Sequence, residues 1–242
     1  IREFLKHASV LEGYNELEKA ESLYEKALLL GPTDLKVLDS FAVFLHKKKG
    51  EISRAESFFR RAVQVYAPQL MMDLKIGVSK GARPPLESPI QSPNSASSSP
   101  IAKSPMDPWE EKGSRTSVAS VIRLLLNYAA FINRGKGDVE GAFIIYRRAY
   151  RIDATNAKVL AHFAHFLAEE GGDFINSPSK NATNERNRSF TTLEAERLFS
   201  LALKSNPGDP LIALWYAKLL KKDRKFGQSE LMYKVAYESC IS

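Results

Sequence analysis

The chain has 242 residues, of which 44% are hydrophobic and 26% are charged, so it is long enough and apolar enough to bury the core of one or two domains. Cys240 is its only cysteine, which excludes an internal disulfide framework and a cysteine-rich zinc site. The formal net charge of +7 favours acidic partners without naming one.

No apolar run comes near the roughly 18 residues that a membrane span requires. The first ten residues, IREFLKHASV, contain neither an initiator Met nor the basic, apolar and small-residue pattern of a secretory signal. We therefore expect a cytoplasmic or nuclear protein without a membrane span, and a sequence that is a segment of a longer chain.

One helical pattern occurs five times along the chain, first at residues 20–32, which read AESLYEKALLLGP. Each copy has a small residue, an aromatic residue four positions later and an alanine three positions after the ring. These offsets place all three on one helix face, where small residues let two helices approach and the ring fills the space beside them. We expect the five rings to be largely buried. The sets are Ala20/Tyr24/Ala27, Ala55/Phe59/Ala62, Ala142/Tyr146/Ala149, Ala195/Phe199/Ala202 and Ser229/Tyr233/Ala236.

A second helical pattern precedes each copy and consists of a ring, an alanine directly after it and an apolar residue three positions later. The pairs are Phe41-Ala42, Tyr128-Ala129, Phe163-Ala164, Tyr216-Ala217 and the degenerate His7-Ala8. Each unit is thus predicted to be a helix hairpin that leaves one apolar face for the next unit.

The spacing of the copies is that of a known repeat. Ala20 and Ala55 are 35 residues apart, and Ala195 and Ser229 are 34 apart. With the A-x-x-x-[FY]-x-x-A core and the following Pro32 and Pro207, this resembles the tetratricopeptide repeat, whose period is about 34 residues. The resemblance covers residues 1–66 and 117–242.

The resemblance implies an all-α fold, a right-handed superhelical solenoid of antiparallel helix hairpins, and a protein-binding function. The family usually has Trp and Gly in its first helix, whereas these copies prefer Leu and Ala. The stretch Trp215-Tyr216-Ala217 is closer to the half-a-tetratricopeptide repeats of RNA-processing scaffolds, which remain the second interpretation.

Two gaps between copies exceed one period. Ala55 and Ala142 are 87 residues apart, and Ala142 and Ala195 are 53 apart. The intervening stretches are rich in Ser, Pro, Gly and Asn, which predicts mobile loops. We therefore expect repeats 1–2 at residues 1–66, a disordered loop at 67–116, and repeats 3–5 at 117–242, stacked on the first two and carrying a flexible insert at 171–190. A stack of hairpins buries a continuous core and offers a long binding surface.

The first loop contains Ser-Pro pairs that resemble substrates of proline-directed kinases. Such kinases need an extended, accessible segment, so phosphorylation is one interpretation, and the ordinary composition of loops is the other. The candidate serines are Ser88, Ser92, Ser99 and Ser104.

The sequence has no motif of a known catalytic centre: no glycine-rich phosphate loop, no G-x-S-x-G and no H-E-x-x-H. We expect no enzymatic activity and no cofactor. His162, His165 and Glu169 share one helix face at a spacing that suits a metal. A fourth ligand is missing, so we interpret them as helix-surface residues and expect no metal site.

A row of basic residues occupies one position of the first helices. Arg2, Lys36, Arg123 and Lys158 each lie five residues before the ring position. In tetratricopeptide proteins this position faces the concave groove, so the resemblance implies a ladder of cations, joined on the same face by Leu126, Leu214 and Lys218. Such a groove suits an acidic or amphipathic segment of a partner protein. The alternative is that these are solvated surface residues. Reversing Lys36, Arg123 and Lys158 together is expected to leave the melting temperature nearly unchanged, because these positions are interpreted as surface.

A second set of basic residues falls at the turns between paired helices. It comprises Lys47, Lys48, Lys49, Arg134, Lys136, Lys221, Lys222, Arg224 and Lys225. These cations either complement helix dipoles or form a basic edge for nucleic acid. We rank nucleic acid below a protein partner, because RNA binding usually needs exposed rings among the cations and these rings are expected in the core.

Overall fold

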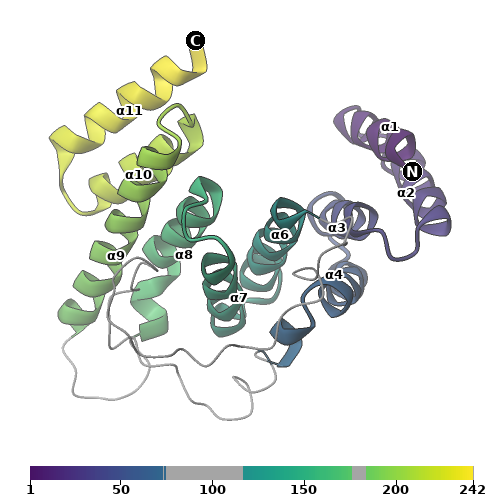
Figure 1. Ribbon diagram of the computed structural model, residues 1–242. Coiled ribbons are helices and arrows are strands. Elements are labelled where there is room, and N and C mark those ends of the chain that lie inside the picture. The colour runs from purple at the N-terminus through teal and green to yellow at the C-terminus, as the bar shows by residue number, and fades with distance from the viewer. Residues whose placement is uncertain (73, 75–116, 176–183, 242) are drawn as a thin grey trace. The chain divides into compact units, whose positions relative to one another are not determined.

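The computed structural model of the chain describes residues 1–72, 74, 117–175 and 184–241, and gives only the backbone for 171–175 and 184–190 (Figure 1). These residues form helices and turns and no strand. They divide into two compact units, the first ending at Ile145 and the second beginning at Tyr146. The prediction of an all-α fold built from helix hairpins is confirmed.

The first unit begins with two hairpins. Helix α1 (Arg2–Gly13) packs against α2 (Leu17–Leu30), and α3 (Leu35–Phe44) packs against α4 (Ile52–Tyr66). The C-terminal end of α3 widens into a π-helical turn, η1 (Leu45–Lys49). Helix α6 (Val118–Lys136) packs on both α3 and α4 and leads into α7 (Val139–Ile152), whose first half belongs to this unit.

The second unit contains the rest of α7 and two further hairpins. Helix α8 (Ala157–Ile175) packs against α9 (Asn184–Ser205), and α10 (Pro210–Lys222) packs against α11 (Phe226–Ile241). Helix α10 also contacts both α8 and α9. In each unit, therefore, a first helix, α6 or α10, packs against both helices of the hairpin before it.

Short sequence signals fix the ends of these helices. The side chains of Asp34 and Asp209 each accept hydrogen bonds from two backbone N–H groups at the start of α3 and α10, which satisfies donors that would otherwise lack a partner. Pro210 takes the first position of α10, where no N–H is needed. The turns within four hairpins contain a residue with positive φ, a conformation that glycine adopts freely. These residues are Asn15, Gly50, Gly137 and Arg224.

Four of the five predicted core rings are buried. Tyr24, Phe59, Tyr146 and Phe199 are at most 5% exposed. Tyr233 is less buried than the other four rings and remains partly exposed. Tyr233 lies on α11, the last helix that the structure describes. Each of the other four rings contacts a ring of the first helix that follows it in the chain.

Helices occupy part of both predicted inserts. Residues 68–72 are helical and Leu70 is buried, while α8 extends to Ile175 and α9 begins at Asn184. The rest of the predicted loops lies outside the described residues, and so do the candidate phosphorylation sites Ser88, Ser92, Ser99 and Ser104. Within the described parts of the chain, no helix combines the length and apolarity needed to cross a bilayer.

Candidate partner-binding surfaces

In the first unit, the predicted ladder is only partly open to a ligand. Arg2 on α1 and Lys36 on α3 are exposed. Arg123 on α6 instead donates a hydrogen bond from Nε to Oδ2 of Asp39 on α3, at 2.9 Å. One turn later, Nδ2 of Asn127 donates to Oδ1 of the same carboxylate, also at 2.9 Å. Arg123 therefore holds α6 on α3 by neutralising an acid that is 2% exposed.

The environment of Asp39 explains why this contact matters. Burial raises the pKa of the Asp39 carboxyl, and the hydrogen bonds and charge of Asn127 and Arg123 offset only part of that rise. Burial removes water from the carboxylate, and without these donors nothing would compensate for the lost solvation. Leu126, expected to contact a ligand, is 6% exposed and belongs to the core.

In the second unit, the corresponding surface is aromatic. The indole of Trp215 on α10 stacks on the imidazole of His165 on α8, with ring centroids 4.5 Å apart and planes within 10°. It also meets the edge of His162 at 5.1 Å. All three side chains are partly exposed, and Lys158 on α8 and Lys218 on α10 are exposed.

The face of α10 adds apolar groups to this arrangement. Leu211, Leu214, Trp215 and Lys218 follow one another at spacings of three, one and three residues, which puts them on one side of the helix. Leu211 is 45% exposed and Leu214 is partly exposed. The α8–α10 face, defined here as Lys158, Leu211, Leu214, Trp215 and Lys218, thus combines apolar surface with two cations.

Trp215 is a candidate binding residue that the sequence analysis did not name. The sequence contained a signal for this residue. Trp215 directly precedes the ring Tyr216, and His162 directly precedes the ring Phe163, so Trp215 and His162 occupy the same position in their helices. His162 and His165, considered with Glu169 as a metal set, contact this indole. In the described parts of the chain, no three His, Cys, Asp or Glu side chains come close enough to hold a metal ion.

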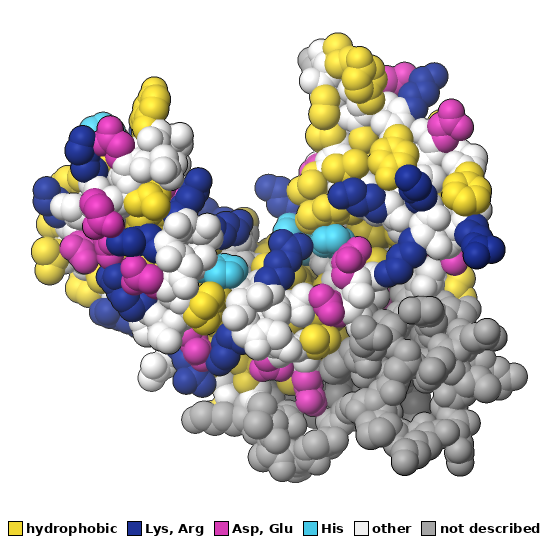
Figure 2. Space-filling model, turned by 180° about the vertical axis from the view of Figure 1, so that it is seen from behind, with side chains coloured by type: hydrophobic (Ala, Val, Ile, Leu, Met, Phe, Trp, Pro, Cys, Tyr) yellow, Lys and Arg dark blue, Asp and Glu magenta, His cyan; other side chains and the backbone are white. Residues whose placement is uncertain are grey.

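The basic clusters at the turns join neighbouring hairpins. Figure 2 shows Lys and Arg side chains spread over the displayed face with apolar side chains among them. In three cases the lysine of a turn pairs with a glutamate on the second helix of the preceding hairpin. The pairs are Lys49–Glu21, Lys136–Glu56 at 2.8 Å and Lys225–Glu196 at 2.6 Å. The predicted basic edge is therefore partly neutralised.

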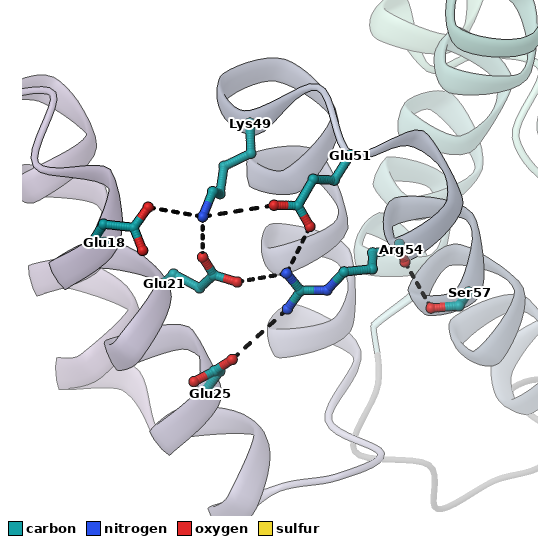
Figure 3. A network of polar contacts seen from close by, with 7 residues as sticks. All are labelled: Glu18, Glu21, Glu25, Lys49, Glu51, Arg54 and Ser57. Carbon is teal, nitrogen blue, oxygen red and sulfur yellow. Dashed lines mark hydrogen bonds and ion pairs between the residues drawn. The ribbon is translucent and has the colours of Figure 1, made fainter.

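The first of these pairs belongs to a larger network (Figure 3). Glu21 accepts hydrogen bonds from Lys49 and, at 2.7 Å, from Arg54, which also donates to Glu51 at 2.7 Å. Burial by itself raises the pKa of Glu21, but hydrogen bonds and charges from Lys49 and Arg54 outweigh it and lower that pKa below its usual value. The network fastens α2 to the second hairpin.

His46 gives the first unit a dependence on pH. Its ring is partly buried and meets the edge of Phe131 at 5.1 Å. Burial lowers the pKa of His46, and the nearby charges of Lys47 and Arg134 lower it further. The folded state thus prefers the neutral ring, so this contribution to stability is present above the unfolded pKa near 6.5 and is lost as the pH falls from there through the lower pKa of the folded state.

We therefore expect the melting temperature of His46→Gln to fall less than that of the unsubstituted chain when pH is lowered from about 7.5 to about 5.5. Thermal unfolding followed by circular dichroism at both pH values measures the difference. Equal falls in the two proteins would contradict the assignment.

Comparison with known proteins relates this geometry to a fold. The sequence matches no protein-family model and no curated protein. Among solved structures, PilF of Pseudomonas aeruginosa, a tetratricopeptide-repeat protein, matches with a TM-score of 0.55 and 15% identity over 98% of this chain and 75% of that one. The chain has a tetratricopeptide-repeat fold. Human IFIT1, solved as a dimer with m7Gppp-AAAA, matches with a TM-score of 0.59 and 12% identity, and this match covers 95% of this chain and 41% of that one.

With this fold established, each helix can be assigned to the first or second position of a repeat. Helices α1, α3, α6, α8 and α10 are the first helices of their repeats, and α2, α4, α7, α9 and α11 are the second. The Arg123–Asp39 contact and the ring cluster at Trp215 both join first helices of successive repeats. The glutamate–lysine pairs join a second helix to the turn of the next repeat.

Proposed function

We propose that the chain is a non-enzymatic protein-interaction scaffold that binds an acidic, amphipathic segment on the α8–α10 face of its second unit. The tetratricopeptide-repeat neighbours suggest protein or peptide partners. The proposal needs no cofactor, because binding to this face requires only apolar contact and charge.

The observation that carries the proposal is a partly exposed tryptophan, Trp215, on two helices that also bear the exposed lysines Lys158 and Lys218. Trp215 is held by His162 and His165, so its orientation is fixed before a partner arrives. Preorganised tryptophans are frequent hot spots of protein interfaces. Lys158 and Lys218 give the surrounding surface a positive charge that favours carboxylates.

The first unit has fewer exposed side chains of the predicted ladder that could contact such a segment. Of its predicted rungs, Arg123 is paired with Asp39 and Leu126 is buried. Arg2 and Lys36 stay exposed, and we assign them the supporting role of attracting an acidic partner over longer range.

Reversing the charge of Lys158 and Lys218 together should weaken partner binding about tenfold, because exposed charges contribute roughly 0–1 kcal/mol each. Binding to the unsubstituted chain should also fall as salt rises. The measurement is quantitative mass spectrometry of proteins retained by the immobilised chain, followed by titration of the retained protein. The matched control is Lys26→Glu with Lys204→Glu, which makes the same charge change on second helices. Equal loss in both double variants would contradict a specific face.

The second candidate function is nucleic-acid binding by a basic edge. One observation favours it, since single strands stack on exposed rings among cations and Trp215 is such a ring. Against it, Lys225 pairs with Glu196, and Lys222 donates to the backbone oxygen of Ala168 at 2.9 Å. Binding of a labelled single-stranded RNA that is lost on reversing Lys221 and Arg224 would place this candidate first.

A further inference from the structure

Asp39 is a buried acid between α3 and α6, and both of its oxygens are already engaged. Oδ2 accepts a hydrogen bond from Nε of Arg123, and Oδ1 accepts one from Nδ2 of Asn127, each at 2.9 Å. With 2% of Asp39 exposed, its carboxylate is closed to a ligand. Hydrogen bonds between two ionised groups are stronger than neutral ones, so Asp39 fixes the guanidinium of Arg123 in place.

Arg123 has hydrogen-bonding capacity that this contact does not use. A guanidinium carries five N–H groups, and Asp39 receives only the one on Nε. Among the residues that the structure describes, none accepts a hydrogen bond from Nη1 or Nη2 of Arg123. The side chain is 49% exposed, so a ligand can reach the part that Asp39 does not engage. Arg123 is therefore a cation held from behind with donors left on its outer end.

A second cation lies on the same side of α3 as Asp39. Lys36 precedes Asp39 by three residues, a spacing that puts both side chains on one side of the helix, about one turn apart. Lys36 is exposed, and its side chain forms no ion pair or hydrogen bond with any described residue. Because Asp39 holds Arg123 from α6, the contact between the two helices brings Arg123 close to Lys36.

Acids do not balance the positive charge of this region. Lys47 on η1 is exposed, and its charge is one of those that offset the rise in the pKa of Asp39 caused by burial. Asp34 is the acid nearest to Lys36 in sequence, and its side chain is occupied by the backbone N–H groups at the start of α3. Lys36, Lys47 and the outer end of Arg123 are thus left with no acid of their own in the described part of the first unit.

We propose that Arg123 and Lys36 form an oxyanion-binding site in the first unit, which takes a carboxylate or a phosphate group. The two terminal amino groups of an arginine donate parallel hydrogen bonds to two oxygens of such a group, and Lys36 adds a point charge beside them. Because Asp39 already holds the guanidinium, binding immobilises little more of this side chain, which favours affinity. The site is polar and separate from the α8–α10 face, so it does not depend on the function proposed for that face.

Titrations of the complete 242-residue chain with inorganic phosphate and, separately, with succinate test the site. The readout is the ¹H–¹⁵N correlation spectrum at constant ionic strength, with chloride as the balancing anion, so that screening does not change during the titration. We expect saturable shifts confined to the N–H signals of residues 35–40 and 120–127. Saturation by phosphate alone would assign the site to a phosphate group, by succinate alone to a carboxylate, and by both to either group.

Three variants locate the binding. Arg123→Lys keeps a cation beside Asp39 but lacks the pair of terminal amino groups, so it should weaken anion binding at least about tenfold while circular dichroism shows a folded chain. Lys36→Gln leaves the contact between Arg123 and Asp39 intact and should weaken binding about threefold, which decides the question if Arg123→Lys does not fold. Lys26→Gln removes an exposed cation from α2 of the same unit and should leave binding unchanged. Absence of saturable shifts with both anions, or equal affinities in the unsubstituted, Arg123→Lys and Lys36→Gln chains, would overturn the proposal.

Discussion

Phe59→Ala is expected to lower the free energy of unfolding by about 3–5 kcal/mol, the usual cost of removing a large buried ring. Phe59 is fully buried and its ring meets both Tyr128 and Phe131, so the cavity would lie between α4 and α6. Urea denaturation of the purified variant measures the loss.

Tyr233→Ala is the matched comparison for this prediction. It truncates the equivalent ring in the last repeat, where one side is open, and should cost roughly 1 kcal/mol. If both variants lost the same free energy of unfolding, the stabilisation by these rings would not depend on packing against the following helix.

Arg123→Glu is expected to be the most damaging charge change on the first helices, at roughly 2–4 kcal/mol. It removes the cation that neutralises buried Asp39 and adds a second carboxylate beside it. The sequence alone predicted little loss of stability on reversing Lys36, Arg123 and Lys158, and the contact with Asp39 changes that prediction for Arg123.

Two further variants test this reason. Lys158→Glu makes the same kind of charge change at an exposed rung and should stay within about 0.5 kcal/mol of the unsubstituted chain. Asp39→Asn in the Arg123→Glu background should recover part of the lost stability, because one of the two facing charges is gone. A double variant no more stable than Arg123→Glu would contradict the electrostatic explanation.

The sequence was sufficient to predict the helices and most of the core, because both depend on local periodicity. Ring and alanine positions recur at helical spacing, and four of five rings lie where this spacing puts them. Tyr233 differs because its burial depends on a neighbouring helix, which its own repeat does not encode.

The binding face was less predictable, because helix position does not reveal which side chains meet across helices. The position two residues before the ring was assigned to the groove. In α3, α6 and α8 it holds Asp39, Leu126 and Ala161, all at most 6% exposed, whereas Leu5 in α1 and Leu214 in α10 are partly exposed. The contact between Asp39 and Arg123 joins residues 84 positions apart, beyond any local pattern.

The direction of the contacts between repeats has a consequence for self-assembly. Each of these contacts joins the second helix of one repeat to the first helix of the next, so it is a heterologous contact, and copies linked through it would grow into an open filament. Helix α1 is a poor match for such growth. It carries His7 in the ring position and Val10 three residues later, and Glu16 lies nine residues after His7, where three other repeats place a lysine eight or nine residues after the ring. If α1 met a face with the charges of α11, Glu16 would face Glu230, and the two like charges would disfavour this contact.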